Sequence, residues 1–244
     1  MTYCLGILLP EGLVLASDSR SSAGFDSIAV VCKLATIAIP GDRLVVIQSA
    51  GNLATTQAVV RELKQALGSG NPKWDVALAP TMSAVAGIVG AKMRDVVLMN
   101  EKFVKPYGDP TASFLVGGQI TGEPPRLLKV YSAGNFVEAS PRTCFLQIGE
   151  AKYGKPILDR ALEPSSTLAE AEKLALLSFD ATIRSNLSVG APIDILRYRT
   201  DSLTADPVIT LEDTDPYWLE LRLRYAEGLN ALVTSLPEPN YHGA

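Results

Sequence analysis

The sequence predicts an α+β fold built from layers of antiparallel sheet and helix. The predicted elements follow the order strands, two helices, strands, two helices, strands, helix. A parallel sheet needs single strands that alternate with helices, and this order lacks that alternation. Hydrophobic residues make up 47% of the chain and charged residues 20%, a balance typical of a packed core. With 244 residues and no repeat or linker, we expect one domain over residues 1–244.

The first sixty residues are predicted to consist mainly of strands separated by turns. Residues 3–9 and 13–17 are apolar and flank the turn sequence Pro10-Glu11-Gly12, which predicts an opening hairpin. A loop is expected at residues 21–24. Further strands are expected at residues 28–34, 36–39 and 44–49.

After Gly51 the apolar residues change to a helical period. The first helix is expected to end at residues 68–70, and a second to cover about 80–99. Thr167 with Glu170 predicts a capping box, and Asp215 before Pro216 is typical of a helix start. The later strands are predicted at 112–117, 127–131, 135–139, 192–198 and 207–211, and the later helices at 149–162, 167–183 and about 215–236, before a loose tail at 237–244.

The residue counts exclude hydrolase chemistry that depends on histidine. The only histidine, His242, lies near the C-terminus, where chain ends are poorly ordered. A Ser-His-Asp or Cys-His site needs an imidazole held against its nucleophile. Cys4, Cys32 and Cys144 are scattered without CxxC spacing, so we predict no metal site and no cofactor.

Charge and hydropathy exclude two classes of partner. The chain has 22 Lys and Arg against 26 Asp and Glu, a net charge of −4, so we expect no nucleic-acid binding. The longest weakly polar stretch, residues 77–91, is too short to cross a bilayer, so we expect no membrane partner. With no secretory signal and an odd, sparse set of cysteines, a cytoplasmic location is expected.

Thr2 is a candidate nucleophile that would bring its own base. Removal of Met1 would make Thr2 the first residue, and small second residues such as Thr permit that removal. A free α-amine has a pKa of about 8 and can accept the hydroxyl proton. A retained Met1 would block the amine and leave Thr2 inactive.

Two further candidates have a functional and a structural interpretation. Lys33 lies in an apolar run, where an ammonium must be paired, and Asp18 can pair with it if the two strands lie side by side. Such a lysine would favour deprotonation of the Thr2 hydroxyl, or the pair is a buried salt bridge. Gly51 precedes the first helix, where its N–H could bind an oxyanion, or it is a turn glycine.

Several segments, in order along the chain, resemble proteasome β subunits, a family of N-terminal threonine hydrolases. Residues 12–24 (GLVLASDSRSSAG) are similar to the family's GxVxAxDSRxTxG segment, and residues 32–34 (CKL) to its lysine segment. Residues 50–57 (AGNLATTQ) resemble the segment with the oxyanion glycine. Matches at 115–118, 131–135 and 187–190 extend the similarity over residues 2–211. The short N-terminus and long last helix are most like the bacterial branch called Anbu.

The resemblance implies a four-layer αββα N-terminal nucleophile sandwich with antiparallel sheets. It implies Thr2 as nucleophile and base, supported by Asp18 and Lys33, with the Gly51 amide as oxyanion donor and Ser188 orienting the amine. A mostly apolar pocket for the residue before the cut bond would lie near Val31, Ser49 and Leu53. The implied assembly is a homo-oligomer, a ring or an open spiral, that acts on peptides or unfolded proteins and has an activator as a further partner.

Two positions depart from the family pattern. Glu150 stands where the family usually has a serine near the α-amine, and Ser185 stands where it has an aspartate. Either Glu150 supplies the missing carboxylate, or it points to solvent and peptidase activity is weak.

We therefore predict a threonine-type endopeptidase, with two alternatives. The first alternative is an N-terminal nucleophile amidase or acyl-transfer enzyme with a narrow non-protein substrate, which the altered positions Glu150 and Ser185 favour. The second is a non-catalytic assembly subunit. The presence of Asp18, Lys33 and Gly51 together argues against the second, since a scaffold has no need of them.

Overall fold

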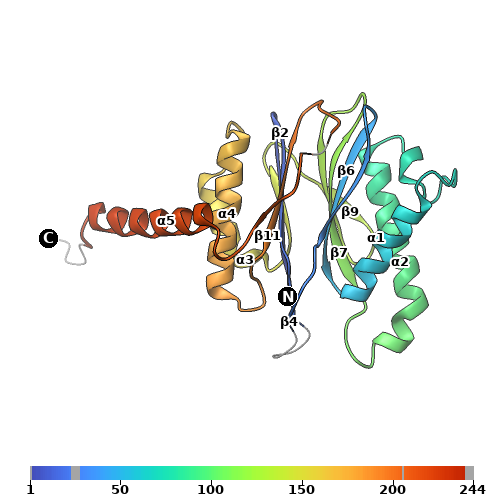
Figure 1. Ribbon diagram of the computed structural model, residues 1–244, viewed down its shortest axis with the longest axis horizontal. Helices are drawn as coiled ribbons and strands as arrows, with labels where there is room; N and C mark the ends of the chain where they lie inside the picture. The colour runs from blue at the N-terminus through green and yellow to red at the C-terminus, as the bar shows by residue number, and fades with distance from the viewer. Residues whose placement is uncertain (1, 23–27, 205, 240–244) are drawn as a thin grey trace.

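The computed structural model describes residues 2–22, 28–204 and 206–239, which form a four-layer αββα sandwich (Figure 1). Two five-stranded antiparallel sheets pack face to face. Helices α1 and α2 cover the outer face of one sheet, and α3 and α4 cover the outer face of the other. The predicted α+β class, with antiparallel sheets between helical layers, is confirmed.

The first sheet has the beginning of the chain near its centre. Gly12 follows the turn of the predicted hairpin with φ +146°, and a Cβ there would lie 1.9 Å from the carbonyl oxygen of Tyr198. Glycine is therefore required at this turn. The strands, in sheet order, are β10 (Phe145–Gly149), β1 (Tyr3–Leu9), β2 (Gly12–Asp18), β11 (Ile193–Arg199) and β12 (Ile209–Leu211).

The second sheet is a meander whose third strand is longer than predicted. Gly117 and Gly118 weakened the strand signal, yet the strand continues to Ile120. Gly118 has φ +148°, and a Cβ there would lie 2.0 Å from the carbonyl oxygen of Leu44 on the next strand. The strands, in order, are β5 (Leu34–Ile39), β6 (Arg43–Gly51), β7 (Ala112–Ile120), β8 (Arg126–Val130) and β9 (Phe136–Glu138).

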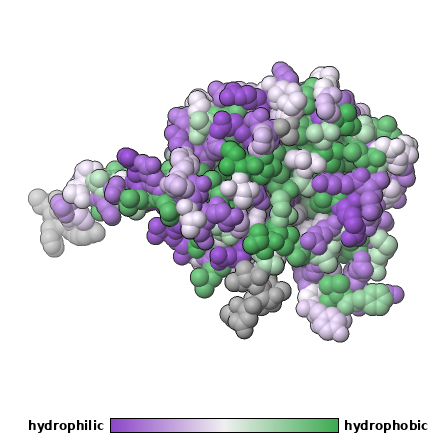
Figure 2. Space-filling view, in the orientation of Figure 1, coloured by the Kyte–Doolittle hydropathy of each residue, from purple (hydrophilic) through white to green (hydrophobic). Residues whose placement is uncertain are grey.

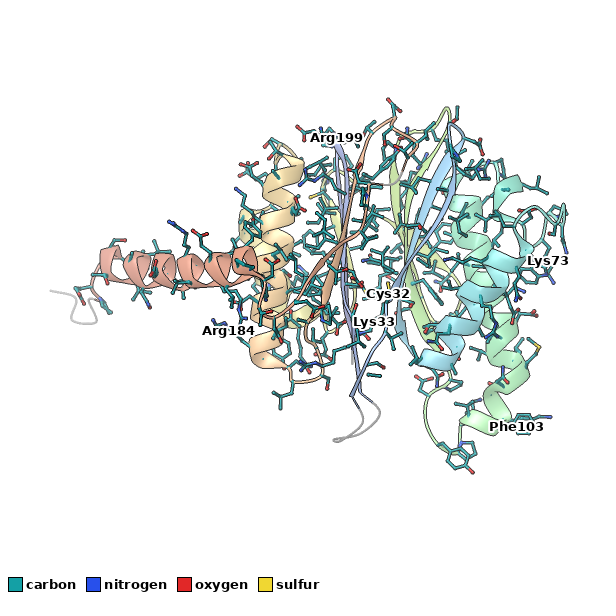
Figure 3. The ribbon with its side chains drawn as sticks, viewed as in Figure 1. Cys32, Lys33, Lys73, Phe103, Arg184 and Arg199 are labelled. Atoms are coloured by element: carbon teal, nitrogen blue, oxygen red, sulfur yellow. The ribbon has the colours of Figure 1, made fainter. Side chains whose placement is uncertain are left out.

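Four of the five α-helices in the described part of the chain begin at residues with capping side chains, and α3 is the exception. Asn52 accepts a hydrogen bond from the N–H of Thr55, and the predicted capping box of Thr167 and Glu170 is present. Helix α2 runs past its predicted end, with Phe103 at its exposed tip (Figure 3). The helices are α1 (Leu53–Ala66), α2 (Met82–Val104), α3 (Ala151–Ala161), α4 (Leu168–Ser185) and α5 (Pro216–Ser235), with a short 3-10 helix at Val76–Leu78.

Apolar side chains fill the three interfaces between the layers. Phe114 and Leu63 belong to the cluster beneath α1 and α2, and Phe179 belongs to the cluster beneath α3 and α4. Leu15 and Leu44 pack between the two sheets. The sheets are therefore rigid supports for residues at their ends.

Helix α5 projects from the sandwich (Figure 1). Trp218 is fully buried in the cluster beneath α3 and α4, and Arg222 donates to Asp180 of α4 at 2.8 Å. Further along the helix, Leu223 and Leu232 are exposed, and apolar and polar side chains alternate along its surface (Figure 2). The base of α5 is thus the part that is packed.

Three further predicted features differ from the structure. Residues 21 and 22 were expected in a loop but belong to β3 (Arg20–Ser22), which pairs with β4 (Ile28–Val30). The predicted strand 28–34 ends at Val30, so Lys33 lies in the short link before β5. Strand β10 was not predicted, although its apolar sequence FLQIG carries a strand signal.

The predictions about the two ends of the chain fall mostly on residues outside the described ranges. Residues 236–239 have no regular secondary structure, whereas Met1 and residues 240–244, with His242, lie outside the described residues. Within the described ranges, no helix is long and apolar enough to cross a membrane.

Candidate functional site

Thr2 is held at one end of the first sheet by the strands on either side of it. Tyr3 pairs with Gly149 of β10, and the Thr2 carbonyl oxygen accepts a hydrogen bond from the Glu150 N–H at 2.8 Å. Gly149 has φ +78°, and a Cβ there would lie 1.8 Å from that carbonyl oxygen. On the other side, the Tyr3 N–H donates to Asp18 Oδ1 at 3.0 Å. The backbone next to Thr2 is therefore fixed from both neighbouring strands.

Asp18 and Lys33 form a buried ion pair beside this chain start. Lys33 Nζ lies 2.7 Å from Asp18 Oδ1 and also donates to the carbonyl oxygen of Arg20. Asp18 Oδ2 accepts from the Gly190 N–H at 3.5 Å. Burial raises the pKa of Asp18 above its usual value, and Lys33 and the N–H groups of Tyr3 and Gly190 oppose that rise.

The predicted ion pair of Asp18 with Lys33 is present, but it forms by another route than the one considered. The pairing was expected if the two strands that carry these residues lie side by side. Instead, Asp18 ends β2 in the first sheet, and Lys33 precedes β5 in the second. Figure 3 shows Lys33 between the two sheets. The ion pair therefore bridges the sheets.

Lys33 shares a pocket of about 140 Å³ with the three predicted pocket residues, Val31, Ser49 and Leu53. We call this the Val31 pocket. Ser49 is anchored there because its N–H donates to the Lys33 carbonyl oxygen at 3.1 Å. The prediction missed Cys32 and Ala35, which flank Lys33, and three residues of α1 that follow Leu53 at helical spacing, namely Thr56, Gln57 and Val60. The walls thus carry hydroxyl and amide groups beside the expected apolar ones.

Gly51 lies at the predicted strand-to-helix junction. It ends β6 opposite Ala112, and Asn52 caps α1 directly after it. Its φ is +118°, and a Cβ there would lie 2.6 Å from the Thr111 carbonyl oxygen. A side chain at this position would therefore displace the backbone amide.

The turn that contains Ser188 approaches Asp18 from a third direction. The Ser188 N–H donates to Asn186 Oδ1 at 2.9 Å, and two residues later Gly190 contacts Asp18. Arg20 covers this turn, because its Nη1 donates to the Leu187 carbonyl oxygen at 3.1 Å. The structure thus brings the Ser188 turn to the ion pair, although among the described residues it records no hydrogen bond from the Ser188 hydroxyl.

The two altered positions have different surroundings. The Glu150 side chain is only 14% exposed, so the interpretation that it points to solvent is wrong. Its Oε2 is buried without a hydrogen-bond partner among the described residues, and Lys152 Nζ is 3.6 Å away. Ser185, by contrast, is exposed at the end of α4, and its hydroxyl has no recorded hydrogen bond to a described residue. Glu150 therefore lies beside Thr2, whereas the structure does not bring Ser185 into contact with these groups.

Sequence reasoning missed three residues that organise the site, namely Tyr3, Arg20 and Gly149. Tyr3 acts through its backbone N–H and Arg20 through its carbonyl oxygen, whereas Gly149 is needed because it has no side chain. Only Gly149 carried a signal, as a glycine between a β-rich run and a helix.

Comparisons with known proteins agree with this geometry. A family model described as "Proteasome subunit" matches residues 2–196. "Proteasome subunit beta 2" of Pyrobaculum neutrophilum is 32% identical over 193 residues, which are 79% of this chain and 86% of that protein.

Two solved structures are similar over nearly the whole chain. One is titled "Helical Assembly of the Anbu Complex from Pseudomonas aeruginosa", with 43% identity and a TM-score of 0.94 over 99% of this chain and 100% of the other. Anbu (ancestral beta-subunit) from Yersinia bercovieri has 39% identity and a TM-score of 0.92 over 98% and 99%. By the family match, its closeness to both structures and the arrangement around Thr2, the chain belongs to the proteasome subunit family.

Proposed function

We propose that this protein is a threonine-type peptidase in which Thr2, freed by removal of Met1, attacks peptide bonds. One observation carries the proposal: Asp18 Oδ1 accepts both the Lys33 ammonium and the N–H that follows Thr2. The Lys33 ammonium is thereby bound to the same carboxylate oxygen that binds the backbone next to Thr2, the candidate nucleophile. A positive charge at this place stabilises the alkoxide of Thr2.

In the proposed reaction the α-amine of Thr2 takes the hydroxyl proton as Oγ1 attacks the substrate carbonyl carbon. The Gly51 N–H binds the resulting oxyanion. The C–N bond then breaks, the proton passes from the α-ammonium to the leaving nitrogen, and an ester to Thr2 remains. Water hydrolyses the ester, which releases the acid and restores Thr2.

Glu150 is the proposed partner of the α-amine. Its carboxylate is mostly buried, and its backbone N–H binds Thr2. A buried carboxylate oxygen without a hydrogen-bond partner is costly, and the ammonium created at Thr2 after Met1 removal would relieve that cost. We assign Ser188 the weaker role of orienting the amine and leave Ser185 out of this network.

The proposed substrates are peptides or unfolded proteins, cleaved inside a homo-oligomer that works in the cytoplasm. The Pseudomonas aeruginosa relative forms a helical assembly by its title, which supports an open spiral more than a closed ring. An assembly that encloses its sites keeps folded proteins away from them. An activator of substrate entry is a further proposed partner.

An amidase with a narrow substrate is the second candidate. The Val31 pocket has a volume of only about 140 Å³ and polar groups in its walls, which suits a small acyl group. Cleavage of a defined small amide, without cleavage of casein or a peptide library, would favour this candidate. Broad cleavage of both protein and peptides would exclude it.

Intact-mass measurement and labelling test the proposed chemistry. We expect the purified protein to lack Met1 and to form a covalent adduct with a peptide vinyl sulfone at Thr2. Thr2→Ala should lose both labelling and turnover, whereas the control Thr234→Ala, in the exposed part of α5, should keep them. Retained Met1 together with no labelling would instead support a non-catalytic assembly subunit, and turnover by pure Thr2→Ala would exclude Thr2 as the nucleophile.

A further inference from the structure

A second pocket includes Gly51 in its wall and shares no lining residue with the Val31 pocket. Its volume is about 380 Å³, and Ala50, Gly51 and Gly149 form the wall nearest the chain start. Gly149 packs against the Thr2 carbonyl oxygen, so this pocket opens beside Thr2. We call it the Lys129 pocket, after the cation in its wall.

Strand alternation directs Lys129 into this pocket. On β8, Leu128 and Val130 pack in the cluster beneath α2, so the residue between them faces the other side of the sheet. Leu127, which shares that side, packs between the two sheets. Lys129 therefore reaches into the space between the sheets at the end where Thr2 lies, and its Nζ lies 5.4 Å from the ring centroid of Tyr131.

Lys129 is a partly buried cation without an anionic partner. No carboxylate among the described residues lies within ion-pair distance of it, although partial burial makes its charge costly. Burial accordingly lowers the pKa of Lys129. A ligand carboxylate would supply the missing partner.

Asp109 is the other charged residue in the pocket wall. It is exposed, and Oδ1 accepts the Thr111 N–H at 2.8 Å, which lowers the pKa of Asp109. The carboxylate is therefore ionised, but its charge is screened by solvent and bound to the backbone. The Asp109 carboxylate therefore weakens the positive potential at Lys129, but it does not form an ion pair with Lys129.

We propose that the Lys129 pocket binds the leaving fragment of the substrate and that Lys129 recognises a carboxylate on that fragment. This inference rests on the proposed function, because it uses the Thr2 reaction to assign the two pockets. When Thr2 attacks a carbonyl, the acyl part and the leaving amine occupy opposite sides of the attacked carbon. With the acyl part assigned to the Val31 pocket, the Lys129 pocket, which also lies next to Thr2, is assigned to the leaving part. The favoured substrate class is peptides or acyl-amino acids with a free carboxylate close to the cleaved bond.

Matched pairs of peptides test this recognition. Each pair has the same sequence and ends, one residue after the cleaved bond, in either a free carboxylate or a carboxamide. We expect wild type to have about tenfold lower KM for the acid with a similar kcat, since one partly desolvated ion pair is worth about that factor. Lys129→Gln should remove this preference and Lys129→Arg should keep it. The control Lys102→Gln, at the exposed end of α2, should match wild type. Equal KM for acid and amide in wild type, or an unchanged preference in Lys129→Gln, would overturn the proposal.

A binding experiment separates this proposal from the proposed function. Thr2→Ala cannot form the ester but keeps the Lys129 pocket, so calorimetry can measure its binding of Ala-Ala and of Ala-Ala amide. We expect the acid to bind about tenfold more tightly than the amide and Lys129→Gln, in the same background, to bind both equally. If binding follows this pattern while Thr2 is never labelled, the pocket assignment holds and the peptidase proposal fails. If the acid shows no advantage while Thr2 is labelled, the reverse is true.

Discussion

Lys33 Nζ lies 2.7 Å from Asp18 Oδ1, and this ion pair connects the two sheets of the sandwich. The same carboxylate oxygen accepts the Tyr3 N–H, so the chain start depends on the position of the ion pair. The carboxylate is fully buried and the lysine side chain is 5% exposed. Substitution of either residue should therefore lower activity more than substitution in an exposed ion pair would.

We expect Asp18→Asn to lose at least about a hundredfold in activity and about 3 kcal/mol of unfolding free energy at pH 7, because Lys33 is left buried without its anion. Burial raises the pKa of Asp18 in the folded state, so folding favours its protonated form. As pH falls through the raised pKa, wild type takes up the proton and gains stability, so the deficit of the variant relative to wild type should widen. Denaturant unfolding of both proteins between about pH 4 and pH 8, at and above the usual Asp pKa of about 4, measures this change. A deficit that closes on acidification would show that the pKa is lowered instead.

Lys33→Met should inactivate the protein and also destabilise it. The change leaves the Asp18 carboxylate buried without its cation, which costs about 3 kcal/mol of unfolding free energy. The double variant Asp18→Asn with Lys33→Met removes both charges and should recover most of that loss without recovering activity. Unfolding free energies of the four proteins in this cycle test the coupling. Additive effects would mean that the two residues do not interact.

Gly51→Ala should lose activity and about 3 kcal/mol of stability, because its Cβ would meet backbone atoms of Thr111 and Ala112 at 2.6 and 2.8 Å. Gly87→Ala is a matched control. Gly87 lies within α2 with nothing within 4 Å of its added Cβ, so this change should stabilise by about 0.5–1 kcal/mol. Thermal unfolding and peptide turnover of both variants provide the comparison. Full activity in Gly51→Ala would argue against a role for this amide.

Glu150→Gln should shift the acidic limb of the pH–rate profile to lower pH by about 0.5–1 unit. A nearby carboxylate raises the pKa of the Thr2 α-amine, and its removal lets the amine lose its proton at lower pH. Glu227→Gln, on the exposed surface of α5, should leave the profile unchanged. Identical profiles for Glu150→Gln and wild type would show that Glu150 does not contact the amine.

Trp218→Ala should cost about 3–5 kcal/mol of unfolding free energy, because this fully buried side chain anchors α5 to the sandwich. Leu223→Ala, five residues further along and 60% exposed, should cost less than about 0.5 kcal/mol in the isolated chain. Chemical denaturation of the two variants tests this contrast. Similar losses in both would mean that α5 is packed along more of its length than its base.

Sequence patterns predicted most elements of the fold because their signals are local. The capping box of Thr167 and Glu170 lies within four residues, and the Pro10-Glu11-Gly12 turn joins adjacent strands. The prediction failed where tertiary contacts outweigh propensity. Gly118 continues a strand because it pairs with Val45 of β6, at a distance that leaves no room for a side chain. Lys33 lies outside any strand, and its ammonium reaches across to Asp18.

The sequence by itself determined the chemical types at the site: a threonine at position 2, a buried acid and base, and a glycine before a helix. Only the tertiary structure decided which of these groups meet and what else meets them. Pairing of β1 with β10 brings Glu150 to Thr2, and the facing of the two sheets brings Lys129 to the same end of the sandwich. These contacts join residues more than a hundred positions apart, and strand pairing at such separation depends on the packing of the whole sheet rather than on any local sequence pattern.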